Sequence, residues 1–179
     1  RRGFFPSTRK KLSGMTGTPS GWVSACIGAI SGTPYLLFGS KDGHFARAAT
    51  TTVTQIAKLA GLAGGIYAII NYNNIAHLGG ATSGGVAVIG TTDAPGTTFT
   101  PLFSADTLNG SARVNCGLRR YVDSDNTPNQ LHFVVVDVTA GNRGWHYMYD
   151  GTSLRELKYW ADYAPQCMVE MDVTGARAL

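Results

Sequence analysis

A repeated pattern of short apolar segments and glycine-rich turns is the strongest constraint on how this chain can fold. From Ile75 to Phe103, IAHLGGATSGGVAVIGTTDAPGTTFTPLF, two apolar segments flank a glycine turn, and an Asp/Gly corner leads into a third extended segment. A close relative of this pattern runs from Leu131 to Leu157, and a looser one begins at Tyr35. The three starts lie about 40 and about 56 residues apart, which is near the length of one propeller blade. We therefore expect one small β-unit that is built several times.

Turn signals between the apolar runs allow each unit to be read as four antiparallel strands. The run from Leu131 to Val138 is the clearest strand, and Met168 to Val173 is expected to be the last one. Between Gln55 and Ala63 the sequence locally favours helix, but Thr50 to Val53 is β-branched, and we place a third strand of the first unit here. The chain has 179 residues, enough for one core, and we predict a single all-β domain over 22–179 after an arm or linker over 1–21. The repeat units are placed at about 35–74, 75–130 and 131–173.

One corner of the second unit resembles a loosened Asp-box of the sialidase-type β-propellers, whose pattern reads Ser-x-Asp-x-Gly-x-Thr-Trp. Thr91 stands for the serine and Phe99 for the tryptophan, with Asp93, Gly96 and one extra residue between them. The segment from Tyr149 to Leu154 resembles the same corner, with Leu154 at the aromatic position. The resemblance covers about residues 30 to 160. It implies a β-propeller-like array of about three four-stranded blades, as in phage or virion surface proteins.

In such propellers the Asp-box is a structural turn, because its carboxylate accepts backbone N–H bonds while the aromatic residue packs between sheets. We assign this turn role, together with the Asp-Gly hairpin of the first unit, to Asp42, Gly43, Asp93, Gly96, Phe99, Asp150 and Gly151. Three blades are too few for a closed ring, since propellers have about four to eight. Either the chain oligomerises, or it belongs to a larger protein, or it forms a β-sandwich or jelly roll instead.

The basic residues are concentrated at the start of the chain. Five of the 15 lysines and arginines fall within the first eleven positions, which leaves a nearly neutral body and a basic arm. Such an arm can contact phosphate groups or an acidic partner surface. The predicted contact residues are Arg1, Arg2, Arg9, Lys10 and Lys11. A solvated terminus without a partner is the alternative interpretation.

The sequence contains no pattern that assigns catalysis or a cofactor. A nucleophile elbow, a phosphate loop and the usual zinc spacings are all missing from it, so we predict no catalytic residue, no metal and no cofactor. Cys26, Cys116 and Cys167 are expected to be free thiols. The sialidase resemblance implies an arginine cluster and a Tyr nucleophile with a Glu partner. Candidates by residue type alone are Arg47, Arg113, Arg119, Arg120, Arg143, Tyr147, Tyr149 and Glu156.

Aromatic residues are dense in the last third of the chain. Exposed aromatic rings beside turns suit contact with carbohydrate or protein, while packing between sheets is the alternative. The candidate ligand-binding residues are Trp145, Tyr147, Tyr149 and Trp160.

We expect a non-enzymatic structural or receptor-binding component of a larger assembly, of the phage tail or virion kind, located in the virion. Its partners would be other copies of itself or neighbouring assembly proteins, with a surface glycan as a further partner and nucleic acid only through the arm. A carbohydrate-binding module is the alternative function, and a sialidase-like glycosidase is the second alternative. The longest apolar runs are shorter than a membrane span.

Overall fold

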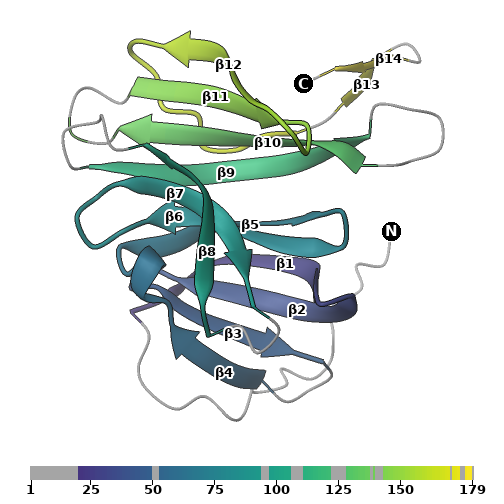
Figure 1. The fold of residues 1–179 in the computed structure, drawn as a ribbon. Helices are drawn as coiled ribbons and strands as arrows, with labels where there is room; N and C mark the ends of the chain where they lie inside the picture. The colour runs from purple at the N-terminus through teal and green to yellow at the C-terminus, as the bar shows by residue number, and fades with distance from the viewer. Residues whose placement is uncertain are drawn as a thin grey trace, which may run out of the picture.

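The chain forms an all-β structure of three four-stranded antiparallel sheets, seen in a computed structural model that describes residues 20–49, 53–93, 97–105, 111–121, 128–137, 139, 143–169, 171–173 and 176–178 (Figure 1). The first sheet contains β1 (Trp22–Ile30), β2 (Thr33–Ser40), β3 (His44–Ala48) and β4 (Val53–Lys58). The second contains β5 (Gly65–Tyr72), β6 (Ile75–Ala81), β7 (Ala87–Thr92) and β8 (Phe99–Ala105). The third contains β9 (Ala112–Tyr121), β10 (Pro128–Asp137), β11 (Arg143–Tyr149) and β12 (Leu154–Trp160).

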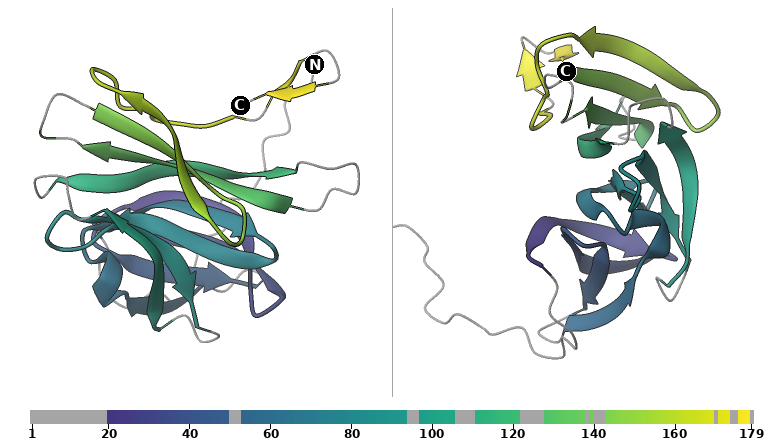
Figure 2. Two further views of the ribbon diagram at one scale, coloured as in Figure 1. Left: turned by 45° about the horizontal axis from the view of Figure 1, so that its top comes forward. Right: turned by 90° about the vertical axis from the view of Figure 1, so that its left-hand side faces the viewer.

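Within each sheet the strands follow chain order, so each sheet is a simple meander. The three sheets stack one after another in an open arc (Figure 2). The first strands of the sheets, β1, β5 and β9, lie next to one another along the inner side of the arc. This arrangement confirms the predicted all-β, propeller-like array of three four-stranded units.

The sheets divide the chain differently from the predicted units. Tyr35 lies in β2, Ile75 begins β6 and Leu131 lies in β10, so each predicted start falls on the second strand of a sheet. The sheets themselves begin one strand earlier, at the starts of β1, β5 and β9. The predicted boundary failed because Asn73 and Asn74 form a hairpin inside the second sheet. Both have positive φ, 50° and 57°, which the tight two-residue hairpin requires and asparagine tolerates.

The strand placed after Thr50 is observed as β4, because pairing with β3 overrides the local helix preference of Gln55 to Ala63, of which only a 3₁₀ turn at Ala60–Leu62 remains. One local prediction needs correction. The segment expected to be a strand at Met168 to Val173 is irregular as far as Val169. It ends in β13 (Met171–Val173), which pairs with β14 (Ala176–Ala178) apart from the third sheet. None of the described helical segments is long and apolar enough to cross a membrane.

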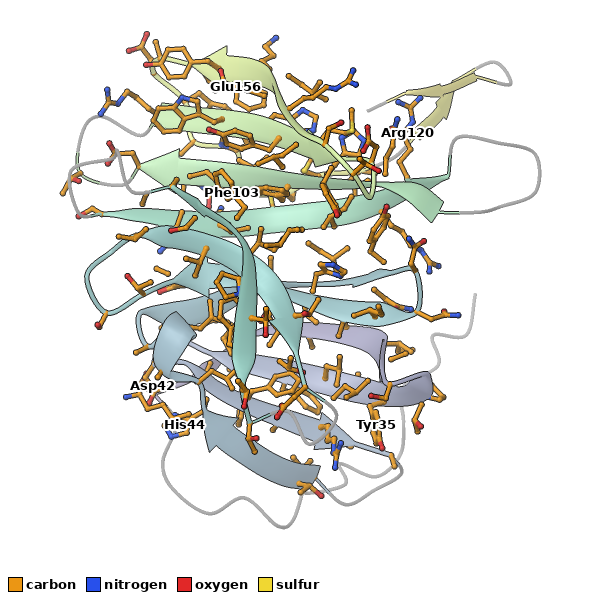
Figure 3. The ribbon with its side chains drawn as sticks, viewed as in Figure 1. Tyr35, Asp42, His44, Phe103, Arg120 and Glu156 are labelled. Atoms are coloured by element: carbon orange, nitrogen blue, oxygen red, sulfur yellow. The ribbon has the colours of Figure 1, made fainter. Side chains whose placement is uncertain are left out.

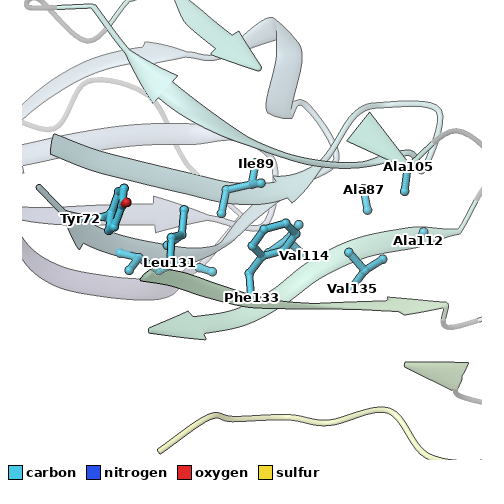
Figure 4. Packing of buried hydrophobic residues seen from close by; sticks show 11 residues of the cluster. Tyr72, Ala87, Ile89, Ala105, Ala112, Val114, Leu131, Phe133 and Val135 are labelled. Atoms are coloured by element: carbon cyan, nitrogen blue, oxygen red, sulfur yellow. The ribbon is translucent and has the colours of Figure 1, made fainter. Parts of the chain in front are cut away.

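Two apolar layers hold the sheets together. The layer between the first and second sheets is built from buried side chains that include Leu37, Phe45, Ile66 and Leu78. The layer between the second and third sheets includes Ile89, Val114, Leu131 and Phe133 (Figure 4). Phe103 packs against this layer. Because each sheet alternates its side chains between two faces, the middle sheet contributes to both layers.

Candidate functional site

The two corners that resemble the Asp-box have the same geometry. Asp93 follows β7, and its Oδ1 accepts the N–H groups of Thr97 and Thr98 at 2.7 and 2.9 Å. Asp150 follows β11, and its Oδ1 accepts the N–H groups of Thr152 and Ser153 at 2.9 and 2.8 Å. Both carboxylates therefore brace the turn between the third and fourth strands of a sheet.

These hydrogen bonds favour the ionised carboxylates. Donation from Thr98, with that from Thr97, lowers the pKa of Asp93, and donation from Ser153 and Thr152 lowers the pKa of Asp150 to about 2. Phe99 packs against the layer between the first two sheets. Gly96 lies outside the described residues. Gly151 has a φ of 96°, which suits glycine in a tight corner.

Asp42 occupies a different place in its sheet, between β2 and β3. The Ser40 hydroxyl donates to its Oδ1 at 2.6 Å, and its Oδ2 lies 3.0 Å from His44 Nδ1 (Figure 3). Burial opposes ionisation, but the contacts with Ser40 and His44 outweigh it and lower the pKa of Asp42. Gly43 has a φ of 82° and completes this turn.

The four predicted ligand-binding aromatics do not form one surface. Trp145, Tyr147 and Tyr149 pack against the layer between the second and third sheets, where Tyr147 lies 4.9 Å from the Phe103 ring. Trp160 pairs with Gly144 and lies on the opposite face of the sheet, beside His146. The alternation of β11 was readable from the sequence, but the face that the second sheet covers was not.

The catalytic candidates implied by the resemblance are also dispersed. Tyr147 lies opposite Glu156 across β11 and β12, but burial, followed by the charge of Glu156, raises the pKa of the Tyr147 phenol. A nucleophile needs the reverse shift. Arg143 is held 2.8 Å from buried Asp137, and Arg47 lies in the first sheet over the Tyr35 ring. The five basic residues of the arm lie outside the described part of the chain.

The inner side of the arc carries a feature that sequence reasoning missed. Each inner strand has a β-bulge near the same level, which leaves Val23, Tyr67 and Asn115 unpaired in β1, β5 and β9. All three residues line a cleft of about 480 Å³ that also contacts residues 166–168. A bulge redirects a side chain out of the regular alternation. Their separations of about 44 and about 48 residues are more regular than those of the predicted unit starts.

Glycines opposite two of these bulges allow the sheets to approach closely. A Cβ on Gly39 would lie 2.5 Å from Ile66 of the second sheet, and a Cβ on Gly79 would lie 2.6 Å from Val114 of the third. The corresponding residue of the third sheet is Val134, which pairs with Cys116 beside the bulge. No room is therefore left there for a further inner strand of the same kind.

Residues 161–169 cover the outer side of the third sheet instead. Val134 and Val136 form a buried cluster with Ala164, against which Met168 packs. Asn115 fastens this segment, because its Nδ2 donates to the Pro165 carbonyl at 3.0 Å and to Gln166 Oε1 at 3.2 Å. We call the outer side of the third sheet, with this cover, the capped face.

The outer side of the first sheet is buried towards β3 and β4, where Ala46, Ala48 and Val53 cluster with Trp22 and Phe38, but exposed along β1 and the start of β2. Cross-strand pairing places Ala25 beside Phe38 and Ile27 beside Leu36 on this side. Ile27 is 74% exposed, Leu36 40% and Val23 38%. We call this apolar surface, formed by Val23, Ala25, Ile27 and Leu36, the open face. Val23 and Ala25 also line the cleft of about 480 Å³, so the open face continues into the inner side of the arc.

A histidine pair lies on the same side of the third sheet as the capped face. His132 Nδ1 is 2.8 Å from His146 Nε2, and His132 Nε2 is 3.1 Å from Gln130 Oε1. Burial, followed by the charges of His146 and Arg120, lowers the pKa of His132 to about 4. Among the described residues, no group of three or more His, Cys, Asp or Glu side chains is arranged to hold a metal ion.

No protein-family model matches the sequence, and no curated protein matches it. A function can therefore be inferred only from the open face, the capped face and the cleft residues.

Proposed function

We propose that this chain is a non-enzymatic structural subunit of a larger assembly, in which a second copy of the chain covers the open face. The observation that carries the proposal is the exposure of Ile27, an aliphatic side chain on β1, the inner edge strand of the first sheet. The corresponding side of the second sheet, which includes Ile66 and Leu78, is buried against the first sheet. The third sheet buries Val114 and Phe133 against the second in the same way. The open face is thus the same kind of surface without its neighbour.

The chemistry of the open face favours an apolar partner. Its central residues are aliphatic, and an apolar patch that remains in water forgoes roughly 25 cal/mol for every Å² that a partner would cover. Contiguous exposed apolar surfaces of this kind mark sites of protein contact. A glycan or a nucleic acid would find no charged or hydrogen-bonding side chain at Val23, Ala25, Ile27 or Leu36.

The capped face supports a face-to-face contact between copies. End-to-end stacking would require the open face of one copy to meet the outer side of the third sheet of another. Residues 161–169 cover that side, and Val134 fills the space that glycine leaves in the other sheets. Two copies that join open face to open face make a self-complementary contact, the arrangement of most closed dimers.

The size of the face indicates a weak contact. The open face lies on β1 and β2, and two strands spaced by about 4.8 Å and about 25 Å long give a face of roughly 250 Å². A stable complex of standard size buries about 800 Å² on each partner. We therefore propose a concentration-dependent dimer that additional contacts strengthen within an assembly, of the phage tail or virion kind. The basic arm, which precedes β1 in the sequence, is the proposed source of such contacts.

Light scattering during size-exclusion chromatography tests this proposal across a range of protein concentrations. The natural chain should shift from monomer to dimer as the concentration rises. Ile27→Lys should abolish the shift, because two lysines would face each other in the apolar contact. Ile75→Lys is the matched control, since Ile75 is 45% exposed but begins β6 in the second sheet.

A chain that stays monomeric at all concentrations would contradict the proposal, as would a dimer that Ile27→Lys leaves intact. A lysine at position 36 tests whether the contact lies on this face. Leu36→Lys should abolish the dimer as Ile27→Lys does, because the two residues pair across β1 and β2. Dispersed NMR spectra of the variants would show that the loss of the dimer is not a loss of folding.

A further inference from the structure

The arginine at the start of β9 is held in place by described side chains none of which is acidic. The Arg113 guanidinium carbon lies 4.4 Å from the centre of the Tyr67 ring, and Arg113 Nε donates to Asn115 Oδ1 at 3.0 Å. Tyr67 and Asn115 are two of the three bulge residues of the inner strands. The bulges of two neighbouring sheets therefore position one guanidinium group from its flat face and from its Nε edge.

The group that holds Arg113 is itself fixed. Asn115 receives the Arg113 Nε–H at its amide oxygen, while its amide nitrogen donates to the Pro165 carbonyl and to Gln166 Oε1. The amide cannot rotate without losing these bonds. The orientation of the guanidinium is consequently set before any ligand arrives, which lowers the entropic cost of binding.

Arg113 lines a cleft of about 250 Å³ whose other polar side chains are hydroxyls. These are Thr82, Ser83 and Ser111, and the rest of the lining is contributed by Gly64, Tyr67, Ala81, Gly85 and Ala112. Thr82 Oγ1 accepts the N–H of Val86, which leaves its own hydroxyl proton to donate. Within the described part of the chain, no carboxylate pairs with Arg113. The cleft thus presents a half-buried positive charge and several hydroxyl donors.

We propose that this cleft binds an oxyanion, a carboxylate or sulfate group carried by a small ligand. A guanidinium group offers five N–H donors in a planar fork that matches two oxygens of such a group. Stacking on Tyr67 occupies one face of the guanidinium plane, and the bond to Asn115 uses the Nε–H. The N–H groups of the two terminal nitrogens therefore remain for the ligand. This proposal stands apart from the proposed assembly function, because it uses neither the open face nor a second copy.

NMR titration of the full chain tests the site with defined probes. Sodium sulfate and sodium glucuronate should produce saturable shifts of the Arg113 Nε–H and of the Ser83 and Ser111 amide signals, with sodium chloride keeping the ionic strength constant. Glucose, which shares the sugar ring but has no charge, should produce none. Saturation by sulfate alone, by glucuronate alone or by both supports an oxyanion site and defines which group it prefers.

Variants of Arg113 distinguish the contribution of its charge from that of its bidentate hydrogen-bonding geometry. Arg113→Gln should abolish saturable binding, and Arg113→Lys should weaken it by about tenfold, because lysine keeps the charge but loses the bidentate geometry. Tyr67→Leu should weaken binding by about fivefold through loss of the stacking surface. Arg155→Gln, on exposed β12, is the control that should leave binding unchanged.

Failure of both anions to saturate would overturn the proposal, as would binding that Arg113→Gln leaves unaltered. Folding of each variant is checked in the same experiment, because the other amide signals must keep their positions. If Arg113→Gln does not fold, Arg113→Lys provides the decisive measurement. An affinity equal to that of the natural chain would then contradict a role for the guanidinium fork.

Discussion

The two outer faces of the array belong to similar sheets but differ in how far other residues cover them. The third sheet has Val134 where the other sheets have glycine, and residues 161–169 are tied down over it by Asn115. The first sheet leaves Ile27 and Leu36 in water. Terminal units of repeat arrays normally carry a covering that the inner units lack. The difference agrees with the proposal that a second copy covers the exposed part of the first sheet.

Acid should distinguish the two faces most strongly. His132 of the third sheet has a pKa of about 4 in the fold, below its ordinary value of 6.5. The unfolded chain therefore binds a proton at a pH where the folded chain does not. The stability that neutral His132 contributes is complete above about pH 6.5 and is lost as the pH falls towards 4. The loss should amount to roughly 3 kcal/mol of unfolding free energy.

Chemical denaturation at pH 7 and at pH 4.5 measures this effect. His132→Gln should reduce the difference in unfolding free energy between the two conditions, and a smaller dependence should remain from His77 and His146, whose pKa values burial also lowers. Hydrogen exchange should show that β10 and β11 lose protection before β1 and β2. Equal acid sensitivity of the natural chain and His132→Gln would contradict this assignment.

Close contact between sheets gives the next largest effect. Gly39→Ala and Gly79→Ala should each destabilise the fold by about 2 kcal/mol, because the new Cβ would lie within 2.6 Å of Ile66 or Val114 and the sheets would have to separate. Gly84→Ala is the control, because the nearest atom to its Cβ would be Thr82 Oγ1 at 3.8 Å. Thermal unfolding should show a change of less than about 0.5 kcal/mol for Gly84→Ala. Similar losses of unfolding free energy for Gly79→Ala and Gly84→Ala would show that Gly79 is not needed for the close contact between the sheets.

Release of the cover should have a smaller effect. Asn115→Ala removes the bonds to Pro165 and Gln166, and we expect a loss of about 1 kcal/mol. Limited proteolysis should then cut within residues 161–169 faster than in the natural chain. Gln166→Ala removes only one of these bonds, so its rate of cleavage should lie between those of the natural chain and Asn115→Ala. A cover that resists protease equally in Asn115→Ala would show that the apolar contacts of Ala164 hold it alone.

The sequence predicted the class of fold because its evidence was local. Short apolar runs, the Asp42–Gly43 turn and the Asp93 and Asp150 corners each depend on neighbouring residues. Boundaries between sheets were misplaced because the polar Asn73–Asn74 hairpin has the composition of a linker, whereas the true linker before β5, LAGLAG over 59–64, is apolar and its leucines are buried. Only pairing between distant strands distinguishes them.

The functional surfaces depended on contacts between sheets, which the sequence does not display. The alternation of Trp145, Tyr147 and Tyr149 showed that they share a face, but not that the second sheet covers it. The bulges that bring Tyr67 and Asn115 around Arg113 arise from register shifts in two strand pairs, and no local motif marks them. Arg113 was accordingly only one arginine among several candidates by type.

Truncation of the open face provides the smallest and most selective test. Ile27→Ala in dilute solution should change the unfolding free energy by less than about 0.5 kcal/mol, because the Ile27 side chain is 74% exposed and loses few contacts. If a second copy covers this side chain, the same substitution should become more destabilising as protein concentration rises, since association stabilises only the folded state. Ile75→Ala should show no such dependence. Thermal unfolding across a concentration series therefore separates an exposed residue with no partner from one that a partner buries.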